Sequence, residues 1–483
     1  MLVEKLEAIL PEAVAGQPVA VRDTVYVGTL GGQVRAYALG DGHEIWTTQL
    51  NSSIYGAVFV RGGRLYTGDL SATAYCLNST TGALIWQTSV GDASYEGIYG
   101  SPTLANGKIV VGISTFTGDN PCSRGRVIGL NAASGAVAWT YYTVDDSSTG
   151  GGIWTTAAAE DATGRVFLST GNPCTGNAFS SLDCDAIICL DTATGAEIWH
   201  YQVIANDQGD SDFGGSPVLF NAGGIPAVAA GNKDGNVYAV RRDTGAPLWA
   251  TQIAGKAGFT GDIGCISTPA VLSDRLVVGC GQTLDGQPGA VVALNSATGA
   301  VRWRYAMMAP VYGPIAATNG VILACSALPE LMALSASTGD SLYKGVLGLG
   351  GGAVFGGPSV SHGYVLVPSF DYKVYQFSFP TVPTGIDIRD EPQSAGISQT
   401  ILARVESNGG VRLSAAGVLH DTRATIVDAE GRSIAQVSLA GGTTGASGYW
   451  DGRNTAGRRA PHGVYLVHLD GTVASTRFVL AAH

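Results

Sequence analysis

One part of the chain combines an aromatic ring, an amide and several carboxylates at spacings that could support chemistry. The run SSTGGGIWTTAAA places Trp154 where comparable segments begin an inner strand with Gly, Ser or Pro. The strand pattern LSTGNP ends in Asn172, 18 residues later. The following YQVIANDQGDSDFGGSP brings Asp207, Asp210 and Asp212 to just before the next inner strand. Carboxylate and amide oxygens suit Ca²⁺ or a similar hard cation, and a carboxylate without a cation can act as a general base. A bulky ring at a crowded position predicts that another group stacks on it.

The same residues allow a purely structural interpretation. Asp and Asn often bond their own backbone in turns, so Asp207 to Asp212 could be solvated turn residues. A fold does not by itself imply a function. At this point the alternatives are a metal and ligand site, or loops whose polar residues only shape turns.

The elements that must position these residues recur along the chain. Seven times a turn of small residues is followed by a large aromatic, and successive aromatics are 40, 53, 60, 50, 54 and 40 residues apart. Periods in this range indicate a propeller or a solenoid, in which no single unit buries its own hydrophobic face. We expect the rings to be core residues that cover the gap to the next blade. They are Trp46, Trp86, Trp139, Trp199, Trp249, Trp303 and Tyr343.

Each repeat carries strand patterns. RLYTGDL and TAYCLN alternate apolar and polar residues at period two, and TTG supplies a turn. Small residues and proline recur where inner strands begin, as in YGSPT and GGSPV, because strands near a propeller axis crowd together. An eighth unit has three strands and no aromatic closing strand, which the segment from Leu2 to Leu10 could supply. We predict an all-β, eight-bladed propeller, with seven blades as the alternative.

The composition fits a turn-rich all-β protein. Of 483 residues 69 are Gly, 13% are charged and the net charge is −11, which argues against nucleic-acid binding because that function requires a basic face. No apolar run is long enough to span a bilayer. Met1 to Gly16 does not resemble a signal peptide, because Glu4, Glu7 and Glu12 interrupt it, so we expect an incomplete N-terminus.

The cysteines indicate an oxidising compartment. Cys174 and Cys184 bracket a polar loop and form one candidate pair, and Cys265 and Cys280 lie on neighbouring strands and form another. Two bridges would favour a periplasmic or extracellular location, although spacing alone does not prove connectivity. No partner is predicted for Cys122.

The pattern changes after about residue 380. We assign residues 1–380 to the propeller, 381–398 to a linker without periodicity, and 399–483 to a small β-sandwich built from short strands such as RATIVDA and GVYLVHL.

The repeats resemble the PQQ-enzyme repeat. Blades three to five resemble the quinoprotein alcohol dehydrogenases and, in DSDFGGSPV, the polyvinyl alcohol dehydrogenase-like proteins. In that family a Trp after a Gly-rich run lies under the quinone, an Asn in a TGNP strand binds the metal, and an Asp after a YQ segment is the base. The resemblance implies these roles for Trp154, Asn172 and Asp210. It also implies that Lys233, in GNKDGNVYA, bonds the quinone oxygens, and that Asp212 corresponds to the added metal ligand of lanthanide-dependent members.

The resemblance further places Ser114, at the end of VVGIS, among the cofactor-binding residues, with Asp210 also near the metal. The chain departs from the family pattern at three points. Thr117 stands where the family has a metal-binding glutamate, and Asp119 is the nearest carboxylate. Gly209 replaces the tryptophan of a WD pair, and the vicinal cysteine pair that often covers the quinone is absent.

The last hundred residues resemble the immunoglobulin-like module of flagellar hook-capping proteins and related secreted bacterial proteins. The resemblance is carried by GYWDGRNTAGRRAPHGVYLVHL, with Trp450, Gly452, Gly457 and Gly463 at its turns. A sorting or attachment role and a plain structural role are both open.

Three functions compete. The resemblance favours a PQQ-dependent enzyme that uses Ca²⁺ or a lanthanide, with Asp210 and Lys233 as catalytic residues, to oxidise a small or polymeric alcohol. It would pass electrons to a separate acceptor such as a cytochrome, because the chain has no C-x-x-C-H haem motif. The alternatives are a non-catalytic propeller that binds proteins, like the outer-membrane assembly lipoprotein, and an adhesion protein displayed through its C-terminal module.

Overall fold

The chain forms two compact units, Met1–Thr381 and Val382–His483, which are described separately. The computed structural model describes the chain except residues 1–2, 116–119, 175–182, 206, 208, 257–263, 348–353, 379–399, 407–409, 417–419, 429–432, 443–444, 461–462, 470–474 and 481–483. The regular elements of the described residues are all β-strands. No helix in this described part is long and apolar enough to cross a membrane.

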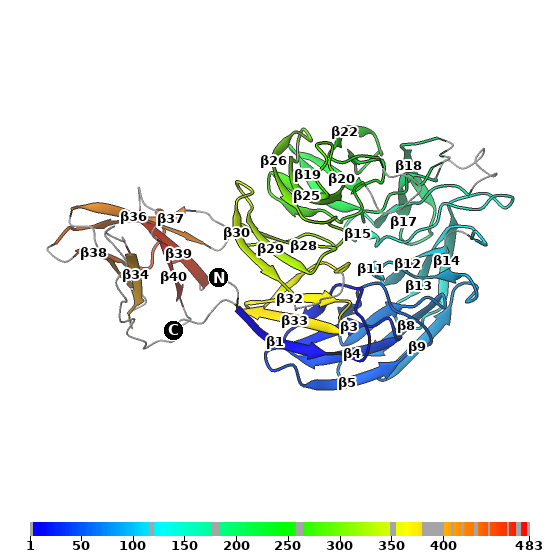
Figure 1. The fold of residues 1–483 in the computed structure, drawn as a ribbon, viewed down its shortest axis with the longest axis horizontal. Helices are drawn as coiled ribbons and strands as arrows, with labels where there is room; N and C mark the ends of the chain where they lie inside the picture. The colour runs from blue at the N-terminus through cyan, green and yellow to red at the C-terminus, as the bar shows by residue number, and fades with distance from the viewer. Residues whose placement is uncertain are drawn as a thin grey trace. The chain divides into compact units, whose positions relative to one another are not determined.

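The first unit is an eight-bladed β-propeller (Figure 1), as the repeats predict. Each blade is an antiparallel sheet whose strands follow one another from the axis outward, because successive period-two segments are joined by tight turns. Blade 1 contains β2 (Val19–Val21), β3 (Thr24–Gly28), β4 (Gln33–Ala38) and β5 (Glu44–Gln49). Blade 2 contains β6 (Phe59–Arg61), β7 (Arg64–Gly68), β8 (Thr73–Asn78) and β9 (Leu84–Ser89). Blade 3 contains β11 (Thr103–Ala105), β12 (Lys108–Thr115), β13 (Arg126–Asn131) and β14 (Val137–Tyr142), and β10 (Glu96–Gly97) also pairs with β12.

The remaining blades repeat this order. Blade 4 contains β15 (Ala158–Glu160), β16 (Arg165–Ser169), β17 (Ala186–Asp191) and β18 (Glu197–Gln202). Blade 5 contains β19 (Val218–Ala222), β20 (Ile225–Gly231), β21 (Asn236–Arg241) and β22 (Pro247–Gln252). Blade 6 contains β23 (Ala270–Leu272), β24 (Arg275–Gly281), β25 (Gly289–Asn295) and β26 (Val301–Met307), and blade 7 contains β27 (Ala316–Thr318), β28 (Val321–Ser326), β29 (Glu330–Ser335) and β30 (Ser341–Val346).

The N-terminal strand closes the ring. Blade 8 contains β31 (Ser359–Ser361), β32 (Tyr364–Ser369) and β33 (Lys373–Ser378), and its outermost strand is β1 (Val3–Ile9). β1 pairs antiparallel with β33 from Val3 opposite Ser378 to Ile9 opposite Lys373, as the neighbouring blue and yellow strands of Figure 1 show. The prediction that the segment from Leu2 to Leu10 completes the eighth blade is confirmed.

The recurring tryptophans fasten each blade to the next one. Each lies on the outermost strand of its blade, and its indole Nε1–H donates to a backbone carbonyl in the outer turn of the following blade. The six bonds are Trp46 to Ser79 (3.1 Å), Trp86 to Ala132 (3.2 Å), Trp139 to Thr192 (3.0 Å), Trp199 to Arg242 (3.1 Å), Trp249 to Ser296 (3.0 Å) and Trp303 to Ala336 (3.1 Å). The rings are therefore core residues, and their one polar atom is satisfied across the blade boundary.

The glycine of each outer turn is required for two reasons, its backbone conformation and its contact with a tryptophan ring. Gly195 has φ of +72°, which disfavours any other residue. A Cβ at Gly195 would also lie 2.5 Å from the ring of Trp139. The seventh aromatic, Tyr343, packs against a buried cluster that includes residues of blade 8, in which the outermost strand is β1.

The second unit contains two antiparallel sheets with a shared core. One sheet has the order β34 (Thr400–Val405), β35 (Val411–Ala416), β38 (Gly445–Trp450), and the other β37 (Ser433–Leu439), β36 (Thr422–Asp428), β39 (Gly463–Leu469), β40 (Ser475–Leu480). Leu413, Ile426, Val467 and Trp450 are buried in one cluster between them. The indole N–H of Trp450 donates to the carbonyl of Arg453 in the turn that follows (2.7 Å). The relation of this unit to immunoglobulin-like modules stays a prediction.

The predicted bridge between Cys265 and Cys280 is wrong. Both residues carry thiols and are completely buried in one apolar cluster. Cys265 occupies the position that Ile98 and Ile153 hold in other blades, directly before the axial residue, so it packs as a small hydrophobic side chain.

We predict that the contact between turn glycine and tryptophan contributes to stability beyond backbone strain. Gly195→Ala should lower the free energy of unfolding by about 2–4 kcal/mol, since it adds overpacking against Trp139 to the cost of a left-handed Ala. The matched control is Gly320→Ala, because Gly320 has a similar φ of +77° and nothing within 4 Å of the added Cβ. It should cost only about 1 kcal/mol. Denaturant unfolding measures both, and equal losses would contradict the prediction.

Candidate functional site

Trp154 belongs to a ring of axial residues. In every blade a buried apolar residue is followed by one residue that faces the axial cavity or lies at its rim, and then by a small residue. The eight axial residues are Ala15, Tyr55, Tyr99, Trp154, Gly214, Ile266, Tyr312 and Phe355, and all of them line one cavity. The expectation that Trp154 is a bulky ring among small residues is therefore wrong, because four of the other seven blades also carry an aromatic there. The small residues come one position later, where a Cβ on Gly56 or Gly100 would meet the backbone of the next blade within 3 Å.

Two cavities meet at Trp154. The larger one, of about 540 Å³, follows the axis and is lined by the residues after Trp154, such as Thr155 and Thr156. The smaller one, of about 30 Å³, is polar and is lined by residues before Trp154, such as Gly150 and Gly152, together with Asn172 and Asp212. The indole thus forms part of the wall of a hydrophobic channel on one side and of a polar pocket on the other.

An ammonium group lies at the centre of the predicted site. Lys233, in the loop between β20 and β21, donates to Asp210 (2.7 Å) and to Asp212 (3.1 Å). Its Nζ is 5.3 Å from the centre of the Trp154 ring, within range of a cation–π interaction. Burial alone would lower the pKa of Lys233, but Asp212 and Asp210 outweigh it, so the pKa of the ammonium is raised. Trp154, Lys233 and the two aspartates therefore converge as the sequence predicts.

Asn172 is tied to the same cluster. Its backbone N–H donates to Asp212 Oδ1 at 2.6 Å. Its side-chain Nδ2 donates to the carbonyl of Pro173 (3.1 Å), so the amide oxygen is the atom that this side chain can offer a cation. Burial raises the pKa of Asp212, and the charge of Lys233 opposes that effect. Among the predicted metal ligands, Asn172 and Asp212 line the small cavity, whereas Asp210 is one-third exposed beyond it.

Glycines shape the small cavity. A Cβ at Gly152 would lie 2.5 Å from the hydroxyl of Ser114, and one at Gly171 would lie 3.0 Å from Asp212 Oδ1. Ser114, the predicted cofactor-binding residue, is the next-to-last residue of the long strand β12 and lines this cavity. A space of about 30 Å³ between oxygen donors suits one hard cation or one water molecule. Thr117 and Asp119 lie outside the described residues.

A disulfide closes one wall of the site. Cys122 bonds to Cys174, so the predicted bridge between Cys174 and Cys184 is wrong. The loop of Cys174 crosses to blade 3 because Gly150 forms bridges with both Arg124 and Pro173, which brings Cys122 alongside. Cys184 is a buried thiol beside Gly151. Sequence spacing could not reveal a pairing between loops of two different blades.

Asp207 has a structural role. Its carboxylate accepts hydrogen bonds from the backbone N–H groups of Gly209 (3.0 Å) and Ser211 (2.9 Å). The turn interpretation therefore holds for Asp207, whereas Asp210 and Asp212 point to Lys233. The turn fixes the segment from which both of these residues project.

Asp185 was not among the predicted site residues. It is completely buried, has φ of +47°, and neither carboxylate oxygen accepts a hydrogen bond from the described residues. Burial, and then the charges of Asp212, Asp207, Asp210 and Asp234, raise its pKa to about 9. Its N–H donates to Gly171 (3.0 Å), next to Asn172. Its sequence context, SLDCDAIICL, resembles the start of a strand and does not indicate that the aspartate is buried beside the site.

The cluster can bind two kinds of group. Oxygen atoms from Asn172, Asp210 and Asp212 suit a hard cation. The ammonium of Lys233 and the ring of Trp154 suit a planar ligand that carries oxygen acceptors. All come from one end of blades 4 and 5, because the loops that follow a second strand and those that precede a first strand share an edge of an antiparallel sheet.

Comparisons with known proteins support a redox function for relatives of this chain. The family described as glucose/ethanol/alcohol dehydrogenase, β-propeller domain, matches residues 87–254, a range that contains every predicted site residue. The family described as outer membrane protein assembly factor BamB matches residues 233–477. A polyvinylalcohol dehydrogenase of a Pseudomonas species is 27% identical over 74% of this chain and 67% of its own length. A polyvinylalcohol dehydrogenase of a Sphingopyxis species is 26% identical over 63% of this chain, and the match covers only 57% of that protein.

Solved structures share the fold. The quinohemoprotein alcohol dehydrogenase of Comamonas testosteroni superimposes with a TM-score of 0.67 at 17% identity, over 82% of this chain and 79% of that one. A europium-containing methanol dehydrogenase superimposes with a TM-score of 0.66 at 16% identity, over 78% of this chain and 93% of that one. At these identities the likeness concerns the fold alone.

We predict that Asp185 makes stability fall as pH rises in chelator-treated protein. The folded pKa is raised from 3.8 to about 9, so the stabilising contribution is complete below pH 3.8 and is lost as pH rises toward about 9. Asp185→Asn cannot titrate at this position. Its free energy of unfolding, relative to that of the wild type, should therefore rise by on the order of 1–3 kcal/mol between about pH 5 and about pH 8. Urea unfolding at both pH values measures it.

The control for this experiment is Asp243→Asn, at an exposed aspartate that pairs with Arg241. It should change the free energy of unfolding by less than about 1 kcal/mol at either pH. A pH-independent effect of Asp185→Asn would show that the carboxyl is ionised in the folded protein.

Proposed function

The chain belongs to the family of PQQ-dependent alcohol dehydrogenases and polyvinyl alcohol dehydrogenase-like β-propellers, and on that premise we propose that it oxidises an alcohol with pyrroloquinoline quinone (PQQ) and a metal ion. The observation that carries the proposal is the convergence of Lys233, Asp210 and Asp212 beside the ring of Trp154. The family implies that the quinone and the metal bind here, and the donor set fits both.

The residues divide the work by their chemistry. Trp154 would hold the flat face of the quinone, and Lys233 and Ser114 would hold its polar atoms. Asn172, Asp212 and Asp210 would hold the metal through oxygen atoms, as a hard cation requires. When bound, PQQ supplies the two-electron acceptor for the hydride of the alcohol carbon.

Asp210 is the general base of this proposal. Of the two aspartates on Lys233 it is the more accessible, with a side chain that is 33% exposed against 11% for Asp212. The hydrogen bond from Lys233 fixes its carboxylate, so an oxygen atom can take the proton of a substrate hydroxyl. Asp212, held by Lys233 and by the N–H of Asn172, positions the cluster.

The metal is either Ca²⁺ or a lanthanide. The second aspartate, Asp212, favours a highly charged ion, because it adds a carboxylate to the donor set. The substrate is an alcohol of low molecular mass or a polymer, and the relatives named polyvinylalcohol dehydrogenase support the polymer. A separate carrier such as a cytochrome would accept the electrons. The Cys122–Cys174 disulfide supports a periplasmic or extracellular location.

A second candidate function is a non-catalytic scaffold. It is favoured by the match of residues 233–477 to the outer membrane assembly factor family.

For the C-terminal unit we propose the predicted division, with a linker at 381–398 and an immunoglobulin-like module at 399–483 that serves attachment. Finding this segment on the cell surface would support that role.

We predict that Asp210→Asn abolishes turnover without loss of the cofactor. Dye-linked alcohol oxidation, measured after addition of PQQ with Ca²⁺ or La³⁺, should fall at least about 100-fold because the base is lost. Binding of PQQ, measured by quenching of tryptophan fluorescence, should persist through Trp154 and Lys233. The control is Asp243→Asn, at an exposed aspartate that pairs with Arg241 and lies outside the site, and it should preserve activity.

Two outcomes separate the alternatives. Absence of PQQ binding by the wild type with either ion would contradict the enzyme and leave the scaffold. Full activity of Asp210→Asn with bound PQQ would refute only the assignment of the base.

A further inference from the structure

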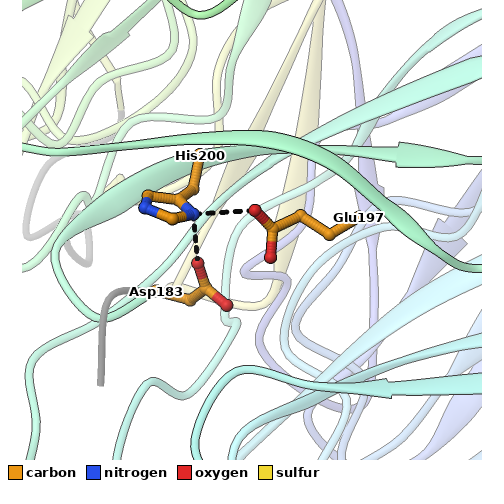
Figure 2. Close-up of side chains that lie close together, drawn as sticks. All are labelled: Asp183, Glu197 and His200. Atoms are coloured by element: carbon orange, nitrogen blue, oxygen red, sulfur yellow. Dashed lines mark hydrogen bonds and ion pairs between the residues drawn. The ribbon is translucent and has the colours of Figure 1, made fainter. Parts of the chain in front are cut away.

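A second cluster of ligand-type side chains lies at the outer rim, where blade 4 meets blade 3. Figure 2 shows the imidazole of His200 with the carboxylates of Asp183 and Glu197 on the same ring nitrogen. His200 Nδ1 is 2.7 Å from Glu197 Oε1 and 3.3 Å from Asp183 Oδ1. Glu197 and His200 lie on β18, and Asp183 precedes β17. The three ligand atoms all lie within 4.8 Å of one another.

A β-bulge brings the two β18 residues to one side. Residues three apart on a regular strand point to opposite faces. In the β17–β18 pair, Cys189 lies opposite Trp199 and Leu190 lies opposite Glu197, so the strand holds one extra residue between them. The bulge reverses the alternation and places Glu197 beside His200.

Tyr141 orients both carboxylates from blade 3. Its hydroxyl lies 2.5 Å from Asp183 Oδ2 and 2.8 Å from Glu197 Oε2. These are the oxygens that do not face His200. The other oxygen of each carboxylate, Oδ1 and Oε1, is thereby aimed at the imidazole nitrogen. A metal ligand is usually held in this way by a neighbouring hydrogen bond.

No permanently charged cation faces the cluster among the described residues. The phenol of Tyr141 has one proton and can donate to only one of the two carboxylates. A protonated Nδ1 of His200 donates to Glu197. Asp183 is only 8% exposed, yet its Oδ1 accepts no hydrogen bond within the described residues. No Lys or Arg of the described chain lies within ion-pair distance of Asp183 or Glu197. A buried carboxylate oxygen without a donor is costly and points to a missing cation.

The repeats provide an internal comparison. At the positions of Glu197 and His200 the other tryptophan or tyrosine strands carry unlike pairs, such as Leu84 and Gln87 in blade 2. At the position of Tyr141 blade 1 has Thr48, whose hydroxyl donates to the next turn glycine (2.7 Å). Since the fold is built seven times without this cluster, its residues are not needed for packing the blade.

We propose that Asp183, Glu197 and His200 bind a divalent first-row transition metal ion, of which Zn²⁺ is the reference case. One imidazole and two carboxylates are a ligand set suited to this class of ion. A fourth position is left to water, since the side chains of His200 and Glu197 are about 30% exposed.

The distances fit such an ion. Tetrahedral Zn²⁺ with bonds of about 2.0–2.1 Å separates its ligand atoms by about 3.3 Å. Asp183 Oδ1 and His200 Nδ1 already have this separation, at 3.3 Å. The contact between Nδ1 and Glu197 Oε1 must widen from a hydrogen bond, when Nδ1 gives up its proton to become a ligand.

The ion would fasten the start of β17 to β18. Asp183 is followed by Cys184 and by Asp185, whose N–H bonds Gly171 beside Asn172. The site is therefore a structural one that supports the back of the candidate active site. It does not depend on the proposed function, because it uses none of the residues that would hold the quinone or its metal.

The test is zinc binding by the full-length protein after treatment with a chelator. Equilibrium dialysis against Zn²⁺ in excess Ca²⁺, followed by elemental analysis, should find one bound equivalent in the wild type. In Asp183→Asn/His200→Gln the affinity should fall at least about 100-fold. The control Asp41→Asn/His43→Gln removes an exposed Asp–His pair (2.8 Å) that has no second carboxylate, and it should leave the bound zinc unchanged.

A spectroscopic measurement guards against misfolding of the double variant. Co²⁺ bound to the wild type should show tetrahedral d–d absorption, and Glu197→Gln should change that spectrum while its circular dichroism stays that of the wild type. The proposal is overturned if the wild type binds no zinc, or if the Asp183/His200 variant retains as much as the Asp41/His43 variant.

Discussion

The contact between each outer tryptophan and the next blade's turn is the interaction on which the propeller depends. A four-stranded blade cannot bury both faces by itself, so its stability comes from its neighbours. The indole supplies a large apolar surface, and its N–H satisfies a turn carbonyl, such as that of Ser79 for Trp46. The turn glycine allows both the positive φ and the close approach of the ring. One contact therefore sets the spacing of the blades.

At one end of the propeller, the loops near the axis carry the polar residues of the candidate site. The strands are held from outside, so the loops at the axis are free to differ between blades. In blades 4 and 5 they carry Asn172, Asp212 and Lys233. The Lys233 N–H donates to the backbone carbonyl of Asp212 (2.8 Å), and the Asn172 N–H donates to the Asp212 carboxylate (2.6 Å). The side chains thus converge because the inner loops of neighbouring blades are joined. At the outer rim of blade 4, Glu197 and His200 flank a β-bulge of β18 that recurs in the other blades, and Asp183 precedes β17.

Buried charge is the cost of this arrangement. Asp212 is hidden from water and has one ammonium and one backbone N–H to satisfy it, while Asp185 behind it has none. Such groups are retained where they serve binding, because burying a carboxyl without a partner is unfavourable. A bound cation would favour the ionised form of these aspartates. This imbalance of charge supports the proposal that the site binds a cation.

The sequence alone determined the propeller, the eight blades and the closing N-terminal strand, because these follow from local periodicity and from a repeated turn. It also predicted Trp154, Asn172, Asp210, Asp212 and Lys233 as site residues, since a resemblance carries residue types at fixed positions, and the structure brings these residues together. Only the tertiary structure decided which side chains meet across blades. Residues far apart in the sequence form the Cys122–Cys174 bridge, surround the buried Asp185 and line the axial cavity together with Trp154. Such contacts are set by blade packing, which no local pattern encodes.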